Sequence, residues 1–215
     1  MVSSHSFPRF TSRVIPVVVL DSPDQALPLG QALLEGGIDV IEVTLRTSAG
    51  GPAISLLRQV LPEIVVTAGS ILTDQDLDAA RNAGAVAAFS PGGTADLLAA
   101  GAASKIPLIP GVATPSELMQ AMTYGYKLVK FFPAETFGGL GALNAFAGPF
   151  AGMRFCPTGG VNRLNLADYL RHPSVAFVGG TWIAPLSLVR DQRWEEIARL
   201  AREATEIVRS LEETR

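Results

Sequence analysis

The chain has 215 residues, of which 48% are hydrophobic and 17% charged, a composition that favours one compact domain spanning residues 1–215. The formal net charge of -3 gives no electrostatic reason to expect a nucleic acid or an anionic membrane as a partner. The single cysteine, Cys156, excludes an internal disulfide. With His5 and His172 as the only histidines, a metal site rich in histidine or thiolate cannot be assembled.

The sequence shows no targeting or membrane-spanning segment. Its first ten residues, MVSSHSFPRF, lack the charged start and the long apolar stretch of a secretory signal. No uninterrupted apolar run reaches the length of about 18 residues that spans a bilayer. We therefore expect a cytoplasmic protein.

Strand and helix patterns alternate along the whole chain. The apolar, β-branched run Arg13–Leu20 is typical of a strand buried on both faces, and the helix that follows ends at Gly36 and Gly37. Eight strands are predicted, at Arg13–Leu20, Val40–Leu45, Ile64–Ala68, Val86–Phe89, Pro107–Ile109, Leu128–Phe132, Arg154–Pro157 and Ser174–Val178. Eight helices are predicted, at Gln25–Glu35, Pro52–Leu61, Thr73–Ala83, Thr94–Ala103, Thr114–Tyr124, Leu140–Phe146, Leu164–Leu170 and Trp194–Leu211.

Eight strand–helix units, spaced by roughly 25 residues without a linker, predict an α/β protein with a single closed parallel (β/α)8 barrel, the TIM barrel. The alternative is a doubly wound open sheet, which usually has fewer strands in a chain of this size. The near-minimal length leaves little room for a covering domain. We therefore expect the exclusion of water from the site to depend on a neighbouring subunit.

A lysine interrupts the apolar strand Leu128–Phe132. Burial deprives an ammonium of its hydration and so favours the neutral amine, which is the nucleophile in Schiff-base chemistry with a carbonyl substrate. The alternative is that the stem of Lys130 packs in the core while its ammonium reaches solvent or pairs with Glu135. Pro133 ends the strand because it has no N–H for the ladder.

The second predicted strand carries polar residues on one face. Alternation directs Glu42, Thr44 and Arg46 toward the interior of the barrel. Taken alone, Glu42 and Arg46 favour an ion pair that only stabilises the barrel. Combined with an inward Lys130, they favour catalysis, because a carboxylate beside an amine is a general acid/base and an arginine fork suits a substrate carboxylate.

Glycine pairs follow the last two strands, in CPTGG (Cys156–Gly160) and VGGTW (Val178–Trp182). Loops at these two places form the usual phosphate cradle of a TIM barrel, since glycine lets backbone amides approach phosphate oxygens. Either pair alone is a weak signal, because glycine pairs are common in turns.

Three further residues are interpreted structurally. Thr114 is expected to cap a helix, with Glu117 completing a capping box. His172 is expected to be a solvated loop residue away from the chemistry. Cys156 is expected to face inward as a small apolar filler.

Segments across nearly the whole chain closely resemble the 2-keto-3-deoxy-6-phosphogluconate (KDPG) aldolase family, which includes the bifunctional 4-hydroxy-2-oxoglutarate (KHG) aldolases. The matching segments are EVTLRT (Glu42–Thr47), SPG (Ser90–Gly92), PLIPGVATPSELM (Pro107–Met119), KFFPAE (Lys130–Glu135), AGPF (Ala147–Phe150), RFCPTGG (Arg154–Gly160) and VGGTW. The resemblance implies a class I, metal-independent aldolase without a cofactor, on a (β/α)8 barrel that is usually a homotrimer.

The resemblance also implies the substrate and the role of each site residue. The substrate would be a phosphorylated 2-keto-3-deoxy sugar acid, cleaved to pyruvate and glyceraldehyde 3-phosphate. Lys130 would be the Schiff-base lysine, Glu42 the general acid/base and Arg46 the binder of the pyruvate carboxylate. The substrate pocket would include Ser70, Pro91 and Thr158, and the phosphate would be held by Gly159, Gly160, Gly179, Gly180 and Thr181.

Three positions depart from the pattern of the family. Thr67 adds bulk after the third strand, Thr181 stands where serine is usual, and Phe137 places an aromatic ring that is expected at the pocket mouth. Two other substrates stay open, namely 4-hydroxy-2-oxoglutarate and the 6-phosphogalactonate epimer. A phosphosugar-binding barrel without catalysis is the alternative of another class.

Overall fold

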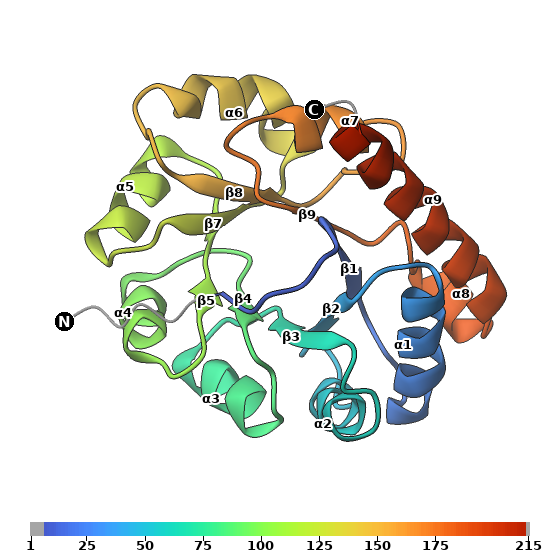
Figure 1. Cartoon of the computed structure of the whole chain (residues 1–215). Coiled ribbons are helices and arrows are strands. Elements are labelled where there is room, and N and C mark those ends of the chain that lie inside the picture. Colours follow the sequence, from blue (N-terminus) through green and yellow to red (C-terminus); the bar gives the residue numbers. More distant parts are fainter. Residues whose placement is uncertain (1–6, 214–215) are drawn as a thin grey trace.

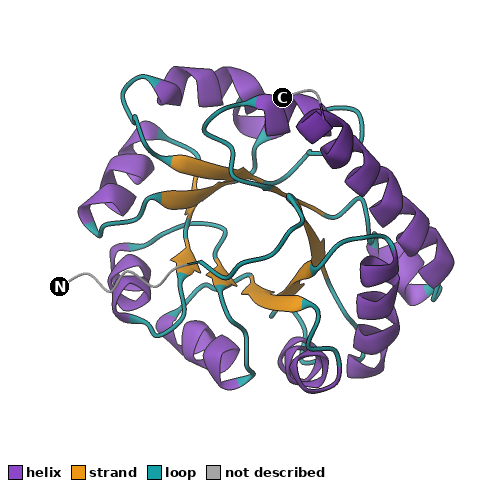
Figure 2. Cartoon of the chain, viewed as in Figure 1, coloured by secondary structure: helices purple, strands orange, loops and turns teal. Residues whose placement is uncertain are grey.

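Parallel strands lie at the centre of the fold and helices surround them (Figures 1 and 2). This computed structural model describes residues 7–213, so His5 lies outside the described residues. The strands are β1 Val14–Val18, β2 Val40–Thr44, β3 Val65–Gly69, β4 Ala88–Phe89, β5 Leu108–Ile109, β6 Gly111–Val112, β7 Leu128–Phe131, β8 Arg154–Pro157 and β9 Val178–Gly180. The α-helices are α1 Ala26–Glu35, α2 Gly50–Val60, α3 Asp74–Asn82, α4 Ala95–Ala103, α5 Pro115–Thr123, α6 Gly139–Ala147, α7 Leu166–Arg171, α8 Leu186–Arg190 and α9 Trp194–Glu213. Two short 3-10 helices are η1 Pro23–Gln25 and η2 Glu135–Phe137.

The strands form a curled parallel sheet in two parts. One part has the order β5-β4-β3-β2-β1-β9 and the other has the order β6-β7-β8. Pro110 separates β5 from β6, because it has no N–H to donate to the ladder. On the other side, the parallel bridges Phe155↔Val175 and Thr158↔Gly179 link β8 to the segment that ends in β9.

The prediction of parallel strands alternating with helices is confirmed. The described residues do not, however, form the continuous eight-stranded ladder of the predicted closed barrel. The predicted fifth strand, Pro107–Ile109, corresponds to β5, but Pro110 is followed by a further strand, β6, that was not predicted. The predicted strand Ser174–Val178 becomes regular only from Val178 onward. The short helix α8 was not predicted. A strand–helix repeat in a sequence indicates the order of the elements, whereas the ladder also depends on where proline removes a donor.

Of the three structural interpretations, two are confirmed and one is wrong. The Thr114 hydroxyl accepts a hydrogen bond from the N–H of Glu117, and the Glu117 carboxylate accepts one from the N–H of Thr114. Cys156 is buried, with 1% of its surface exposed. His172, expected to be solvated, is only 9% exposed, and its Nδ1 accepts a hydrogen bond from the N–H of Ser174 at 3.2 Å. Burial lowers the pKa of His172.

Three phenylalanines, Phe7, Phe10 and Phe177, pack together just before the first residues of β1 and β9 and are called the aromatic cluster below. The ring of Phe89, the last residue of β4, lies 6.3 Å from that of Phe7 and 6.5 Å from that of Phe177. The rings of Phe7 and Phe177 stack with centroids 5.2 Å apart, and Phe10 lies 5.5 Å from Phe177. The carboxylate of Asp39 accepts hydrogen bonds from the N–H groups of residues 11 and 12. The N-terminal segment thus covers the amino end of the sheet with apolar surface.

Within residues 7–213, each helix is too short or too polar to cross a lipid bilayer.

Candidate active site

Strands β2 and β7 bring together two charged side chains that lie 88 positions apart in the sequence. Glu42 is the third residue of β2 and Lys130 the third residue of β7. The Lys130 Nζ lies 3.0 Å from Glu42 Oε1 and 3.2 Å from Oε2. Lys130 is 5% exposed and Glu42 is 1% exposed. A hydrogen-bonded ion pair is the arrangement that allows two such charges to be buried.

The surroundings of this pair are apolar and closely fitted. The Lys130 Nζ lies 5.4 Å from the centroid of the Phe89 ring and 5.6 Å from that of Phe132, within the range of cation–π attraction. A Cβ atom on Gly69 would come within 2.2 Å of Glu42 Oε1. Only glycine at this position leaves room for the carboxylate.

A cavity of about 400 Å³ opens onto the Lys130–Glu42 pair. Its lining comprises Val17, Glu42, Arg46, Ser70, Leu72, Pro91, Lys130, Phe132, Thr158, Gly159, Gly160, Val161, Gly180 and Thr181. Every site residue predicted from the sequence is in this set except Gly179. A Cβ atom on Gly179 would lie 2.5 Å from the Thr158 Oγ1. Gly179 therefore packs directly against the side chain of Thr158, which lines the cavity.

Four lining residues were not predicted as site residues, and all four are apolar. Phe132 had a signal, because strand alternation places it on the same face as Lys130. Val17, Leu72 and Val161 had none, since an apolar side chain near a cavity has the same sequence pattern as one in the core. Leu72 is 62% exposed and lies at the open side of the site.

Two alternative ion pairs considered from the sequence are absent among the described residues. Glu42 pairs with Lys130 and not with Arg46, which is exposed two residues beyond the end of β2. Glu135 does not pair with Lys130, because its carboxylate accepts a hydrogen bond from the phenol of Tyr169. Arg46 therefore faces the cavity without a carboxylate partner in the described part of the chain.

Ser70 and Thr158 place hydroxyl groups in the cavity wall. Ser70 has a φ of 62°, a left-handed conformation that is uncommon for a residue other than glycine and recurs at functional sites. The Thr158 hydroxyl donates to the carbonyl of Cys156 at 3.3 Å and lies 3.6 Å from the Cys156 Sγ. Burial raises the pKa of the Cys156 thiol to about 12, in spite of the nearby charge of Lys130.

The departures from the family pattern differ in their relation to the site. Thr181 lines the cavity. Thr67 is fully buried and donates to the carbonyl of Ile41 at 2.9 Å. Phe137, expected at the pocket mouth, is 48% exposed and does not line the cavity.

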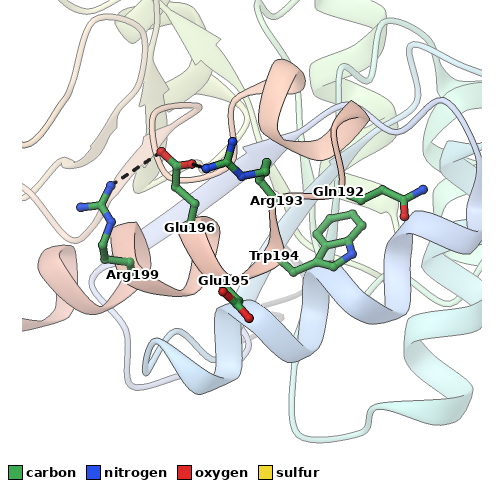
Figure 3. A pocket seen from close by; sticks show the side chains of 6 residues that line it. All are labelled: Gln192, Arg193, Trp194, Glu195, Glu196 and Arg199. Carbon is green, nitrogen blue, oxygen red and sulfur yellow. Dashed lines mark ion pairs between the residues drawn. The ribbon is translucent and has the colours of Figure 1, made fainter.

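A second hollow lies where α8 leads into α9, and three of its lining residues form ion pairs with one another (Figure 3). Arg193 pairs with Glu196 at 2.9 Å, and Arg199 approaches the same carboxylate at 3.8 Å. This hollow contains neither a buried amine nor a buried carboxylate. Within the part of the chain that the structure describes, no cluster of three histidine, cysteine or acidic residues is placed to hold a metal ion.

Comparison with known proteins places these features in a family. The family model for KDPG and KHG aldolases matches residues 9–200. The KHG/KDPG aldolase of Escherichia coli K12 is 47% identical over 196 residues, which cover 91% of this chain and 92% of that protein. The 2-dehydro-3-deoxy-phosphogluconate aldolase of Pseudomonas aeruginosa is 46% identical over 195 residues, covering 91% and 89%.

Among solved structures, a KDPG aldolase from Legionella pneumophila has a TM-score of 0.87 and is 46% identical. The match covers 90% of this chain and 94% of that one. That structure holds pyruvate captured at low pH as a covalent carbinolamine intermediate. The chain belongs to the KDPG and KHG aldolase family.

Proposed function

We propose that this protein is a class I aldolase that cleaves 2-dehydro-3-deoxy-6-phosphogluconate to pyruvate and glyceraldehyde 3-phosphate. The observation that carries the proposal is the Lys130 Nζ 3.0 Å from the Glu42 carboxylate, at a cavity of about 400 Å³. An amine and a carboxylate buried together are what imine formation followed by proton transfer requires.

The first step needs a neutral amine, and the geometry supplies a proton acceptor for it. Glu42 is within hydrogen-bond reach of the Lys130 ammonium and takes one of its protons as the substrate ketone enters. The free lone pair of Lys130 then attacks C2 of the substrate to form a carbinolamine. Glu42 returns its proton to the carbinolamine hydroxyl, which leaves as water, so that Glu42 is again a carboxylate and the product is a protonated imine, an electron sink at C2.

Glu42 also serves the bond-breaking step. Its carboxylate removes the proton of the C4 hydroxyl, directly or through a water, and the C3–C4 bonding electrons move toward the imine. Glyceraldehyde 3-phosphate leaves and an enamine remains. The proton on Glu42 is then delivered to C3, and hydrolysis of the resulting imine releases pyruvate and returns Lys130 to its amine form.

The rest of the cavity wall fits the two ends of the substrate. Arg46 offers an exposed guanidinium for the carboxylate of the pyruvate part, while Ser70, Pro91 and Thr158 lie along the cavity. The phosphate is assigned to the glycine-rich turns, which comprise Gly159, Gly160, Gly179, Gly180 and Thr181. This assignment is supported by the positive φ angles of 94° at Gly159 and 85° at Gly160. Glycine adopts such angles readily, and the absence of a side chain lets a phosphate approach the backbone N–H groups.

We further propose that the chain forms one domain whose two sheet parts act together as a closed (β/α)8 barrel. Only Pro110 separates β5 from β6, and Thr158↔Gly179 bridges β8 and β9.

A homotrimer and a cytoplasmic location stay predictions. The exposed, apolar Leu72 at the open side of the cavity supports a neighbouring subunit there. Sedimentation velocity would measure the oligomeric state.

A second substrate is favoured by the names of the relatives, since the Escherichia coli protein is a KHG/KDPG aldolase. 4-Hydroxy-2-oxoglutarate has the same reacting carbons but no phosphate, and the 6-phosphogalactonate epimer differs in stereochemistry. The hydroxyl of Thr158, inside the cavity wall, favours the gluconate epimer. Values of kcat/KM for the three substrates would rank them.

The decisive experiment is trapping with sodium borohydride in the presence of pyruvate, followed by intact mass measurement and peptide mapping. A reduced pyruvate adduct on Lys130 is the expected result. A folded sample that forms no adduct on any lysine would exclude the Schiff-base mechanism and leave a phosphosugar-binding barrel without catalysis.

A further inference from the structure

The turn that follows β8, residues 158–160, accepts backbone hydrogen bonds from the start of η2. The N–H of Ala134 donates to the carbonyl of Thr158 at 2.8 Å, and the N–H of Glu135 donates to the carbonyl of Gly159 at 3.0 Å. Both N–H donors come directly after β7, the strand that carries Lys130. The segment after β7 therefore positions both the Lys130 amine and this turn. The position of the turn therefore depends on the segment around Glu135.

The third carbonyl of the same turn is also engaged. The side-chain amides of Asn162 and Asn165 donate to the carbonyl of Gly160 at 3.0 and 3.2 Å. In contrast, the N–H of Gly160 makes no hydrogen bond within the part of the chain that the structure describes. All three carbonyls are thus turned toward protein donors, which leaves an amide available for a bound anion.

The side chain of Glu135 packs directly against Gly160. The φ of Gly160 is 85°, and a Cβ atom there would lie 2.4 Å from Glu135 Cγ. The side chain of Glu135 therefore limits how far this part of the turn can move away from the cavity. Glu135 does not line the cavity itself, so its influence on a ligand acts through the turn.

Glu135 is fixed in turn by Tyr169 on α7. Tyr169 is fully buried, and its phenol donates a hydrogen bond to Glu135 Oε1. Burial, and then the bond to the carboxylate, raise the pKa of the Tyr169 phenol, so the phenol stays protonated and keeps donating at neutral pH. A Cβ atom on Gly139 would lie 2.8 Å from Glu135 Oε1 and 3.0 Å from the phenol oxygen, so glycine there leaves room for the pair.

We propose that Glu135 and Tyr169 are positioning residues that hold the turn at residues 158–160 in the shape that binds the phosphate group, and that they thereby set the preference for phosphorylated over unphosphorylated substrates. This inference rests on the proposed aldolase function and deepens it. Neither residue touches the buried amine, so the chemistry at Lys130 is expected to proceed without the pair.

The test compares Tyr169→Phe and Glu135→Ala with the parent protein on two substrates, the phosphorylated sugar acid and 4-hydroxy-2-oxoglutarate. Loss of one charge-assisted hydrogen bond behind the turn is expected to raise KM for the phosphorylated substrate about tenfold, with kcat little changed. The value of kcat/KM for 4-hydroxy-2-oxoglutarate is expected to stay within about twofold, because that substrate has no phosphate. Glu135 is exposed, so its variant tests the inference even if Tyr169→Phe folds poorly.

Two controls separate positioning from a general loss of stability. In Glu135→Gln the amide oxygen still accepts from the Tyr169 phenol, so near-parental KM values are expected. Tyr126→Phe removes a partly buried phenol that donates to the carbonyl of Leu98 on α4 at 2.9 Å. This variant is expected to leave the ratio of kcat/KM for the two substrates unchanged.

The outcomes divide cleanly. An equal loss on both substrates, or no loss on either, in Tyr169→Phe and Glu135→Ala would overturn the positioning role. A parent protein that cleaves neither substrate and forms no pyruvate adduct on Lys130 would instead overturn the proposed function. The two failures are therefore distinguishable.

Discussion

The amino and carboxyl ends of the sheet differ in the kind of side chain that fills them. At the amino end, the aromatic cluster packs ring against ring, with Phe7 and Phe177 5.2 Å apart. At the carboxyl end, a buried amine, a carboxylate and two glycine-rich turns surround a cavity of about 400 Å³. Apolar burial at one end stabilises the fold, while the other end keeps buried charges that contribute little to stability. We therefore expect substitutions at the two ends to affect different measurements.

The largest expected effect is at Lys130. Lys130→Ala removes the proposed nucleophile, so turnover should fall by about four orders of magnitude or more, and borohydride with pyruvate should add no mass. It also leaves Glu42, which is 1% exposed, without its partner. The matched control is Lys127→Ala, at an exposed lysine of the same segment, which should retain parental turnover. Substantial activity in Lys130→Ala would show that the reaction does not need this amine.

The next largest effect is expected at Glu42. Glu42→Gln keeps the shape of the side chain and a hydrogen-bond acceptor for the lysine but removes the proposed base, so kcat should fall by about two to four orders of magnitude. Circular dichroism and thermal unfolding should show a folded protein. Glu63→Gln, at an exposed carboxylate, is the control and should have parental kcat. Near-normal turnover in Glu42→Gln would mean that another group moves the protons.

A substitution in the aromatic cluster should lower the stability of the protein and leave its turnover nearly unchanged, the opposite of what is expected for Glu42→Gln. Phe177→Ala removes a ring that is 7% exposed, and we expect it to lower the free energy of unfolding by about 3 kcal/mol. The melting temperature should fall by about 10 °C, whereas kcat/KM at 25 °C should change little. Val60→Ala, at a side chain that is 54% exposed, should change stability by less than about 0.5 kcal/mol. A large loss of kcat/KM in folded Phe177→Ala would contradict the separation of the two ends.

The smallest effect concerns Cys156, which lies beside Lys130 and Glu42 and yet is expected to be inert. Burial raises its pKa to about 12, so the group remains a protonated thiol at pH 8, and only the thiolate is alkylated readily. Iodoacetamide at pH 8 should not modify the folded protein, as measured by intact mass. Complete modification in denaturant is the positive control. Rapid alkylation of the folded protein would show that the carboxyl end is more open than the structure indicates.

The sequence by itself determined the succession of elements and most residues of the site. Apolar runs, caps and glycine stops have local causes, so the prediction of alternating strands and helices held for β1, β2 and β7 within a few residues. Strand alternation also indicated that Glu42 and Lys130 share the interior. A lysine inside an apolar strand is a local anomaly, and a local anomaly can be recognised without the fold.

Only the tertiary structure decided which partners meet. Glu42 could have paired with Arg46, and Lys130 with Glu135, but the curvature of the sheet joins Glu42 to Lys130 across 88 positions. The burial of His172 and the bond between Glu135 and Tyr169 likewise arise from segments far apart in the chain. Spacing in a sequence indicates which face a side chain occupies, whereas the distance between two faces depends on how all the strands pack.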